Sequence, residues 1–470
     1  MNRVRPSGAA SHLDLFEQPA STRAVALLVF GAALIVFLVS PVRQIADSKY
    51  SMVLSQSLWE RGRFDLDGYF APDHDRYTTR LETVNGHLYY AFPPGSSLLS
   101  VPFVGAMNML GVAAVRPGGL YDRGAENAIQ AFLAALLMAG LAAIIFETAR
   151  RFLPLGWSLA VAAGGAFGSQ VWSTASRGLW SDTWGIFLIG CVVWLLVRVD
   201  RGEARQPVLL ATLLSWSYFV RPTNSVAILA VTVYILAWHR GLFLRYALTG
   251  GAWLALFIGY SWLHFGTVLP SYFQAHRLGG ARLKLAAAGI LVSPSRGLLV
   301  FVPTLFFVAY LIVRYRRHLP QPRLVWIALA TIVGHVAAAS SYWQWWAGHS
   351  YGARFTTGLV PWFALLAILG LRAMLKAREE GTAGAAGKRW EHAVAATLLL
   401  ASLFVNGRGA TSYATVRWNQ LPVDVDEEPR RVFDWRRPQF LAGFLVPGGG
   451  LSTSNGLRPR APSGPPPKEY

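Results

Sequence analysis

The stretch AVALLVFGAALIVFLVSPV, Ala24–Val42, runs for 19 residues without a charged side chain. A helix needs about 20 predominantly apolar residues to cross the hydrocarbon core of a bilayer. This stretch is longer than the apolar core of a typical signal peptide, and no A-x-A cleavage site follows it. We therefore expect an uncleaved first membrane span that is preceded by a polar cytoplasmic arm, residues 1–23.

Ten further apolar runs predict membrane spans, which makes about eleven with the first. An odd number places the C-terminus on the outer side. Two of the runs are short and flank Arg221-Pro222, so we expect a bent or re-entrant pair there, because proline breaks a helix. The ten runs are Ala128–Thr148, Leu155–Ser173, Thr183–Val197, Val208–Val220, Val226–Trp238, Tyr246–Phe265, Leu298–Val313, Leu324–Ser341, Thr357–Leu371 and His392–Val405.

Composition supports an all-α polytopic membrane protein. The chain has 470 residues, of which 53% are hydrophobic and 14% are charged, whereas soluble proteins carry roughly 25% charged residues. The transmembrane domain is expected over residues 24–405, including a long first outer loop at 43–125. That loop holds an amphipathic helix pattern at Ser48–Glu60 and an apolar run at Ser97–Leu110 that suits an interfacial helix. An outer-face tail follows at 406–470, and its last 25 residues are expected to be disordered.

The net charge of +19 orients the chain rather than indicating nucleic acid as a partner. Nineteen Lys and Arg lie in the N-terminal arm and the short loops assigned to the inside, against seven in the short outer loops. A basic excess in short loops marks the cytoplasmic side. We expect a plasma (inner) membrane protein with its N-terminus in the cytoplasm. The single cysteine, Cys191, lies in an apolar run and is interpreted as a small core residue.

Two carboxylates are predicted at the outer ends of spans, where charge is costly and usually has a partner or a task. Asp47 follows the first span, and Asp182 opens the span at 183–197. Such a pair can act as general base and orienting group, or can hold a divalent metal. The alternative is that each is a helix N-cap, a position that aspartate favours. The residues alone leave both alternatives open.

Three arginines are predicted at the same face: Arg221, Arg296 and Arg354. The guanidinium fork suits a phosphate, so together they can hold a lipid phosphate, whereas snorkelling to headgroups is the alternative. The loop before Arg354 contains Trp346 and His349, which can stack on a sugar, although interfacial tryptophans more often form the aromatic belt. P-loop, G-x-G-x-x-G, G-x-S-x-G and paired Cys/His zinc patterns are absent from the sequence, which argues against a nucleotide-driven pump.

The first outer loop resembles that of GT-C glycosyltransferases, in particular the protein O-mannosyltransferase-like and lipid A aminoarabinose transferase group. The resemblance is carried by DSKY at Asp47–Tyr50 and by NGHLYYAFPPG at Asn85–Gly95, and it extends over roughly residues 24–370. Asp182, Arg221-Pro222 and Arg354-Phe355 follow in the order of the family's later landmarks. Ser48 stands where the family has a second acidic residue, and Phe92 stands where it has a lysine before Pro-Pro.

The resemblance implies an inverting transfer of a hexose or pentose from a polyprenyl-phosphate donor to a glycan, lipid or protein acceptor on the outer face. It implies that Asp47 is the general base and that Asp182 orients the acceptor or a metal. Arg296 and Arg354, with Arg221, would bind the donor phosphate, and Lys49 and His87 would substitute for the missing lysine. Further substrate contacts are expected from these residues: Tyr50, His87, Tyr89, Trp346 and His349.

Two other function classes remain open from the sequence. The first is a transporter of a lipid-linked sugar or polysaccharide, although such proteins often contain inverted repeats and none is visible here. The second is a non-catalytic envelope assembly protein, which predicts that Asp47, Asp182 and Arg354 are all replaceable. The expected partners are the bilayer, the lipid-linked donor and the acceptor. A divalent metal is left open.

Overall fold

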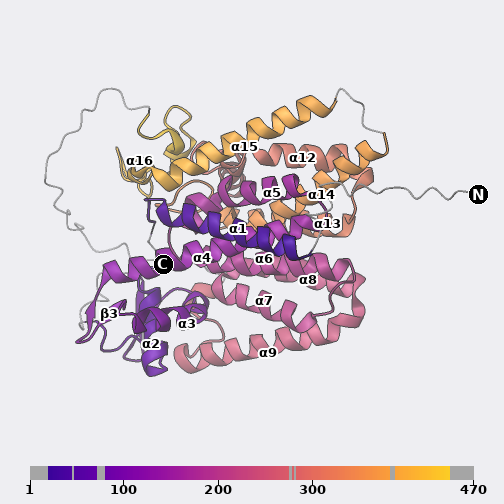
Figure 1. The fold of residues 1–470 in the computed structure, drawn as a ribbon. Coiled ribbons are helices and arrows are strands. Elements are labelled where there is room, and N and C mark those ends of the chain that lie inside the picture. Colours follow the sequence, from indigo (N-terminus) through magenta and orange to yellow (C-terminus); the bar gives the residue numbers. More distant parts are fainter. Residues whose placement is uncertain are drawn as a thin grey trace, which may run out of the picture.

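The computed structural model describes residues 19–44, 47–70, 80–274, 278–279, 282–381 and 387–444. The last 25 residues, which are expected to be disordered, lie outside the described residues, and so does most of the N-terminal arm. The described chain is a helical bundle (Figure 1). Its helices are α1 (Pro19–Val39), α2 (Ser51–Arg61), α3 (Gly95–Met109), α4 (Arg123–Arg150), α5 (Leu155–Phe167), α6 (Ser181–Asp200), α7 (Pro207–Val220), α8 (Ser225–Trp238), α9 (Arg240–Phe265), α10 (Leu283–Val292), α11 (Leu298–Phe301), α12 (Thr304–Arg314), α13 (Pro322–Ser340), α14 (Val360–Glu379), α15 (Gly387–Thr411) and α16 (Tyr413–Arg417).

Each of the eleven predicted spans coincides with a helix or a helix pair, so the expected all-α polytopic architecture is confirmed. Seven described helices are long and apolar enough to cross a membrane, and five shorter apolar helices accompany them. The run predicted at 298–313 is divided into α11 and α12 at Pro303. The pair around Arg221-Pro222 is two helices, α7 and α8, joined by a single 3-10 turn, Pro222–Asn224.

Strand structure is confined, in the described residues, to two small antiparallel ladders in the first loop. β1 (Leu81–Val84) pairs with β2 (His87–Tyr90), and β3 (Val115–Arg116) pairs with β4 (Leu120–Tyr121). Asn85 and Gly86 join the first pair with φ angles of 52° and 84°. Positive φ at both central residues is the geometry of the type I′ hairpin turn, which Asn-Gly favours. We did not predict this hairpin, although Asn-Gly is its strongest sequence signal.

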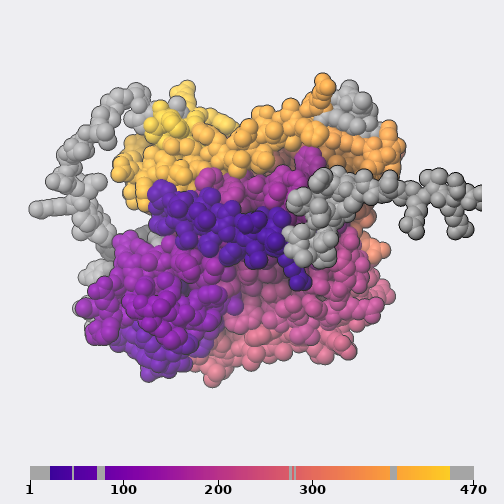
Figure 2. All heavy atoms as spheres, viewed as in Figure 1, coloured from indigo at the N-terminus to yellow at the C-terminus, as the bar shows by residue number. Residues whose placement is uncertain are grey.

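The bundle is organised around α4, which packs against α1, α5 and α6. Its buried face belongs to a continuous apolar core that α14 also enters. Helices α1 and α9, in contrast, present large apolar side chains to the outside; Leu28 and Leu263 are 71% and 81% exposed. Figure 2 shows α1 uncovered on the viewed face. Broad exposed apolar surface of this kind marks contact with lipid.

The first loop and the C-terminal segment lie at one end of the bundle. Helices α2 and α3 with the β3 ladder are grouped at the left of Figure 1, and α16 lies at the same end above them. The C-terminal segment, residues 413–444, contributes Trp418, Val425 and Val432 to a small core that it shares with Trp345 and Trp346. This end of the bundle therefore carries two non-spanning segments that can surround a site.

Candidate active site

Four charged side chains meet at the end of the bundle that bears the first loop. Asp47 follows α1, Asp182 lies in the first turn of α6, and Arg221 follows α7. Arg354 begins a 3-10 helix, Arg354–Leu359, that leads into α14. The structure thus brings together two carboxylates and two of the three arginines that the sequence singled out.

The four groups form a chain of alternating charge. The guanidinium of Arg354 bridges both carboxylates, with Nη2 2.9 Å from Asp47 Oδ2 and Nε 3.3 Å from Asp182 Oδ2. Arg221 Nη1 lies 2.5 Å from the other oxygen of Asp182. A buried charge is tolerated when it is paired and hydrogen-bonded. The two aspartates and two arginines together carry no net formal charge, which allows the group to persist at the edge of an apolar bundle.

Burial divides the two carboxylates into different roles. The side chain of Asp182 is 1% exposed, whereas that of Asp47 is 42% exposed. Asp182 is therefore enclosed between two guanidinium groups and can orient them. Asp47 is the more accessible of the two carboxylates, because only its side chain keeps substantial contact with the surroundings.

The ring of Trp180 stacks against the guanidinium of Arg354. The guanidinium carbon lies 3.6 Å from the centroid of its ring, and Trp180 is 1% exposed. A guanidinium over an indole face gains a cation–π attraction that increases when the pair is desolvated. Trp180 therefore fixes the plane in which Arg354 presents its N–H groups.

The segment that carries Asp47 is held on both sides. The hydroxyl of Tyr90 donates to the Asp47 carbonyl oxygen over 2.7 Å. Before the segment, the buried side chain of Arg177 donates to the Phe37 and Ser40 carbonyl oxygens and so satisfies the C-terminal end of α1. Tyr50 ends the segment at φ 75°, a conformation that is costly for a residue with a side chain. Such strain often accompanies a functional site.

Tyr50 and Lys49 point into the aromatic packing of the first loop. Tyr50 is 1% exposed, and its ring lies 5.1 Å from those of Phe70 and of Tyr121. Lys49 Nζ lies 4.5 Å from the Tyr50 ring centroid. The predicted substrate contact of Tyr50 therefore requires this packing to open, and its observed role is to anchor the turn after Asp47.

A pocket of about 320 Å³ adjoins Arg221 and is the best candidate for a bound substrate. Five of the fourteen described residues that line it are Tyr or Phe, and Arg221 is the only Lys, Arg, Asp or Glu among them. His335, also in the lining, has its Nε2 2.8 Å from the Phe355 carbonyl oxygen. The lining residues are Tyr218, Arg221, Pro222, Thr223, Ser225, Tyr272, Phe273, Gln274, Leu278, His335, Ala338, Ala339, Tyr342 and Phe355.

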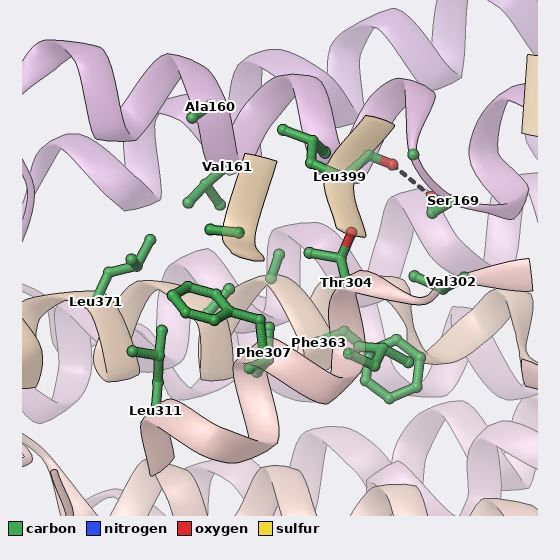
Figure 3. Close-up of a pocket in the computed structure, with 18 of the residues that line it drawn as sticks. Ala160, Val161, Ser169, Val302, Thr304, Phe307, Leu311, Phe363, Leu371 and Leu399 are labelled. Atoms are coloured by element: carbon green, nitrogen blue, oxygen red, sulfur yellow. Dashed lines mark hydrogen bonds between the residues drawn. The ribbon is translucent and has the colours of Figure 1, made fainter. Parts of the chain in front are cut away.

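A second pocket, between α5, α12, α14 and α15, has an apolar lining (Figure 3). Its volume is about 120 Å³, and its polar lining groups are few. One of them, the Ser169 hydroxyl, donates to the Gly165 carbonyl oxygen over 2.5 Å. This pocket therefore offers space for apolar groups only and is not a candidate for the chemistry.

Arg296 lies outside the cluster, and its predicted contact with the donor phosphate stays a prediction that the observed contacts do not favour. All five of its N–H groups donate to protein acceptors, and the residue is 2% exposed. Because no donor is left over, Arg296 anchors the C-terminal segment against the loop before Arg354. The acceptors are the carbonyl oxygens of Ser295, Trp346 and Gly348 and the side-chain oxygens of Asn419 and Gln439.

The other predicted substrate residues also have protein partners. His87 Nδ1 lies 2.6 Å from Asp67 Oδ2. Tyr89, which is also in β2, packs against Phe265 of α9. Trp346 Nε1 donates to Asp426, and His349 Nε2 lies 2.8 Å from Asp424. The first pair organises the first loop and the second ties the C-terminal segment down, so in this structure they border the site rather than form it.

The cluster does not fit a divalent cation in the observed arrangement. Both oxygens of Asp182 and one oxygen of Asp47 face guanidinium groups, and a cation would have to displace Arg354. Elsewhere in the described residues, potential ligand atoms gather at Asp65, Asp67 and His87 and at His349, Asp424 and Asp426. In each group, a histidine nitrogen already contacts an aspartate oxygen.

The sequence analysis did not identify the buried residues that support the segments around Asp47 and Asp182. Gln130 and Glu126 of α4 are fully buried and contact the segments around Asp47 and Asp182. A signal was available for Gln130, because a polar side chain inside a predicted span is costly and usually functional. Tyr90 lies within the motif at 85–95 but was not singled out.

Comparison with known proteins finds similarity to solved structures. No family model matches the chain, and neither does any curated protein. The chain is similar to the crystal structure of ArnT from Cupriavidus metallidurans bound to undecaprenyl phosphate. The two share 14% sequence identity at a TM-score of 0.45, over 90% of this chain and 75% of that chain.

Proposed function

We propose that this chain is an integral membrane glycosyltransferase of the GT-C type that transfers a sugar from a polyprenyl-phosphate donor to an envelope acceptor. The observation that carries the proposal is the Asp47–Arg354–Asp182–Arg221 chain of charges beside an aromatic pocket. It supplies an accessible carboxylate and two guanidinium groups at one end of a helical bundle. Those are the groups needed to accept a proton and to stabilise a leaving phosphate.

In the proposed reaction, a hydroxyl of the acceptor attacks the anomeric carbon of the donor. A new C–O bond forms on the face opposite the phosphate, and the bond between that carbon and the phosphate oxygen breaks. The acceptor proton passes to the carboxylate of Asp47, and the polyprenyl phosphate leaves with the electron pair. A positioned base contributes about 10²–10⁴-fold to such a rate.

Arg354 and Arg221 are the proposed phosphate ligands. Charge grows on the phosphate oxygens as the bond breaks, and preorganised donors aimed at such charge lower the barrier. Arginine presents a planar fork that matches a phosphate. Asp182 holds both guanidinium groups and so sets the distance between the two donors. The aromatic pocket beside Arg221 is the proposed place for the sugar and the first part of the lipid.

The proposed orientation places this end of the bundle on the outer face. It follows from the basic excess in the short loops at the other end, which marks the cytoplasmic side. The first loop and the C-terminal segment then lie outside, where an envelope glycan, lipid or protein is available as acceptor.

The test measures transfer of radiolabelled hexoses and pentoses from undecaprenyl phosphate to an envelope fraction by the full chain in native membranes. We expect Asp47→Asn to lower kcat at least about 10²-fold, with little change in donor KM. Asp122→Asn is the matched control, because Asp122 caps α4 and asparagine makes the same cap.

Near-normal turnover by a folded Asp47→Asn variant would show that Asp47 is not the general base. Movement of labelled lipid-linked sugar across the membrane without any covalent product would instead indicate a transporter. Unimpaired function of variants at Asp47, Asp182 and Arg354 together would indicate a non-catalytic protein.

A further inference from the structure

Gln130 links the two segments that bear the carboxylates. Its side chain is 0% exposed on α4. Its Nε2 donates to the Ser48 carbonyl oxygen over 2.9 Å, and its Oε1 accepts from the Leu179 backbone N–H over 3.3 Å. Ser48 directly follows Asp47, and Leu179 lies three residues before Asp182. One amide group therefore contacts both segments next to the residues proposed to act.

Glu126, one turn earlier on α4, holds the same region from the other side. Its Oε1 accepts from the Met52 backbone N–H over 3.2 Å, and its Oε2 accepts from the Tyr121 hydroxyl over 2.6 Å. Met52 lies in the first turn of α2, where backbone N–H groups lack partners and an anion is favoured. Glu126 therefore fixes the start of α2, and the segment that follows Asp47 is tied to α4 at two points, Ser48 and Met52.

The spacing of the two carboxylates depends on this arrangement. Asp47 lies between α1 and α2, whereas Asp182 lies in the first turn of α6, and Arg354 bridges them only if both keep their places. A side-chain amide has a donor and an acceptor at a fixed separation. Because both are used, one for each segment, the Gln130 side chain sets the two segments relative to rigid α4.

We infer that Gln130 is a positioning residue that sets the distance between Asp47 and Asp182 and so aligns the base with the phosphate ligands. This inference rests on the proposed function. It predicts that loss of the amide lowers turnover more than donor binding, because a misplacement of about 1 Å can cost about 10²-fold in rate.

The test uses two variants and a matched control in the full chain. Gln130→Met keeps the length of the side chain and removes both hydrogen bonds. Gln130→Glu keeps the acceptor but regains the donor only when its carboxyl is protonated. Gln56→Met is the control, because Gln56 is also buried and also bonds backbone N–H and C=O groups, both of Val115, away from the carboxylates.

We expect Gln130→Met to lower kcat at least about tenfold with donor KM little changed. For Gln130→Glu, the ratio of its kcat to that of the wild type should rise as pH falls. Hydrogen exchange gives a readout that needs no activity: the peptides covering 47–50 and 178–182 should exchange faster in Gln130→Met than in Gln56→Met.

The outcomes separate the two claims. Equal exchange and equal kcat in Gln130→Met and Gln56→Met would overturn the inference while leaving the transfer reaction intact. Faster exchange at both peptides in a protein that transfers no sugar would retain the positioning role and remove the proposed function. An equal fall in thermal stability for both Met variants, without a difference in kcat, would reduce Gln130 to a structural contact.

Discussion

The guanidinium of Arg354 lies between the carboxylates of Asp47 and Asp182, 2.9 Å from one and 3.3 Å from the other. The two aspartates are 135 positions apart in the sequence, and Arg354 is a further 172 positions along. The contact engages the carboxylate that we propose as the base. A donor phosphate that attracts Arg354 would loosen this pairing and leave Asp47 available to the acceptor.

Arg354→Lys should lower kcat about 10²-fold while the fold is retained. Lysine keeps the positive charge, but its compact ammonium does not reproduce the planar fork that reaches both carboxylates and stacks on Trp180. The measurement is kcat with thermal unfolding on the same preparation. Arg431→Lys is the control, since Arg431 also stacks on a tryptophan, 4.3 Å from the Trp418 ring centroid, but lies in the C-terminal segment. Equal kcat in the two variants would contradict the role of Arg354.

Arg221→Ala should raise the KM for the lipid-linked donor about tenfold, because a charge-assisted contact to phosphate contributes about 1.5–3 kcal/mol. It should also weaken inhibition by undecaprenyl phosphate added as product. Arg245→Ala, an exposed arginine of α9, is the control for loss of one positive charge. An unchanged donor KM in Arg221→Ala would place the phosphate elsewhere.

Arg296→Met should detach the C-terminal segment rather than weaken donor binding. The substitution leaves buried carbonyl and amide oxygens without their donor, and each buried acceptor left unsatisfied costs about 1–3 kcal/mol. Limited trypsin digestion reports the change, because cleavage after Arg430, Arg431 and Arg436 should become faster when the segment is released. A selective rise in donor KM with unchanged digestion would contradict the anchoring role and support the phosphate role that the sequence suggested.

The sequence predicted the spans well because each depends only on a local run of apolar residues. It also predicted that Asp47, Asp182, Arg221 and Arg354 share one face, since alternating span direction determines which loops lie together. It did not separate Arg296 from that set. Five acceptors for Arg296 come from segments up to 143 positions away, and such pairing leaves no local pattern. The contacts of Gln130, 82 and 49 positions away, are hidden for the same reason.

Gly352→Ala should disturb the site through the backbone that leads into Arg354. Gly352 has φ 59°, and an added Cβ would lie 2.4 Å from the Phe301 ring. Its N–H also donates to Gln439 Oε1 over 3.0 Å. The clash must be relieved by moving either the ring or the segment that carries Arg354, so both thermal stability and kcat should fall.

Gly266→Ala isolates the part of that effect that is due to backbone conformation alone. Gly266 has φ 67°, and an added Cβ would meet no atom within 4 Å. The left-handed conformation costs about 1–2 kcal/mol for a residue with a Cβ, and both variants incur that cost. We expect Gly266→Ala to lower thermal stability with kcat unchanged, whereas Gly352→Ala lowers both. If the two variants have the same kcat, the segment before Arg354 does not determine its position.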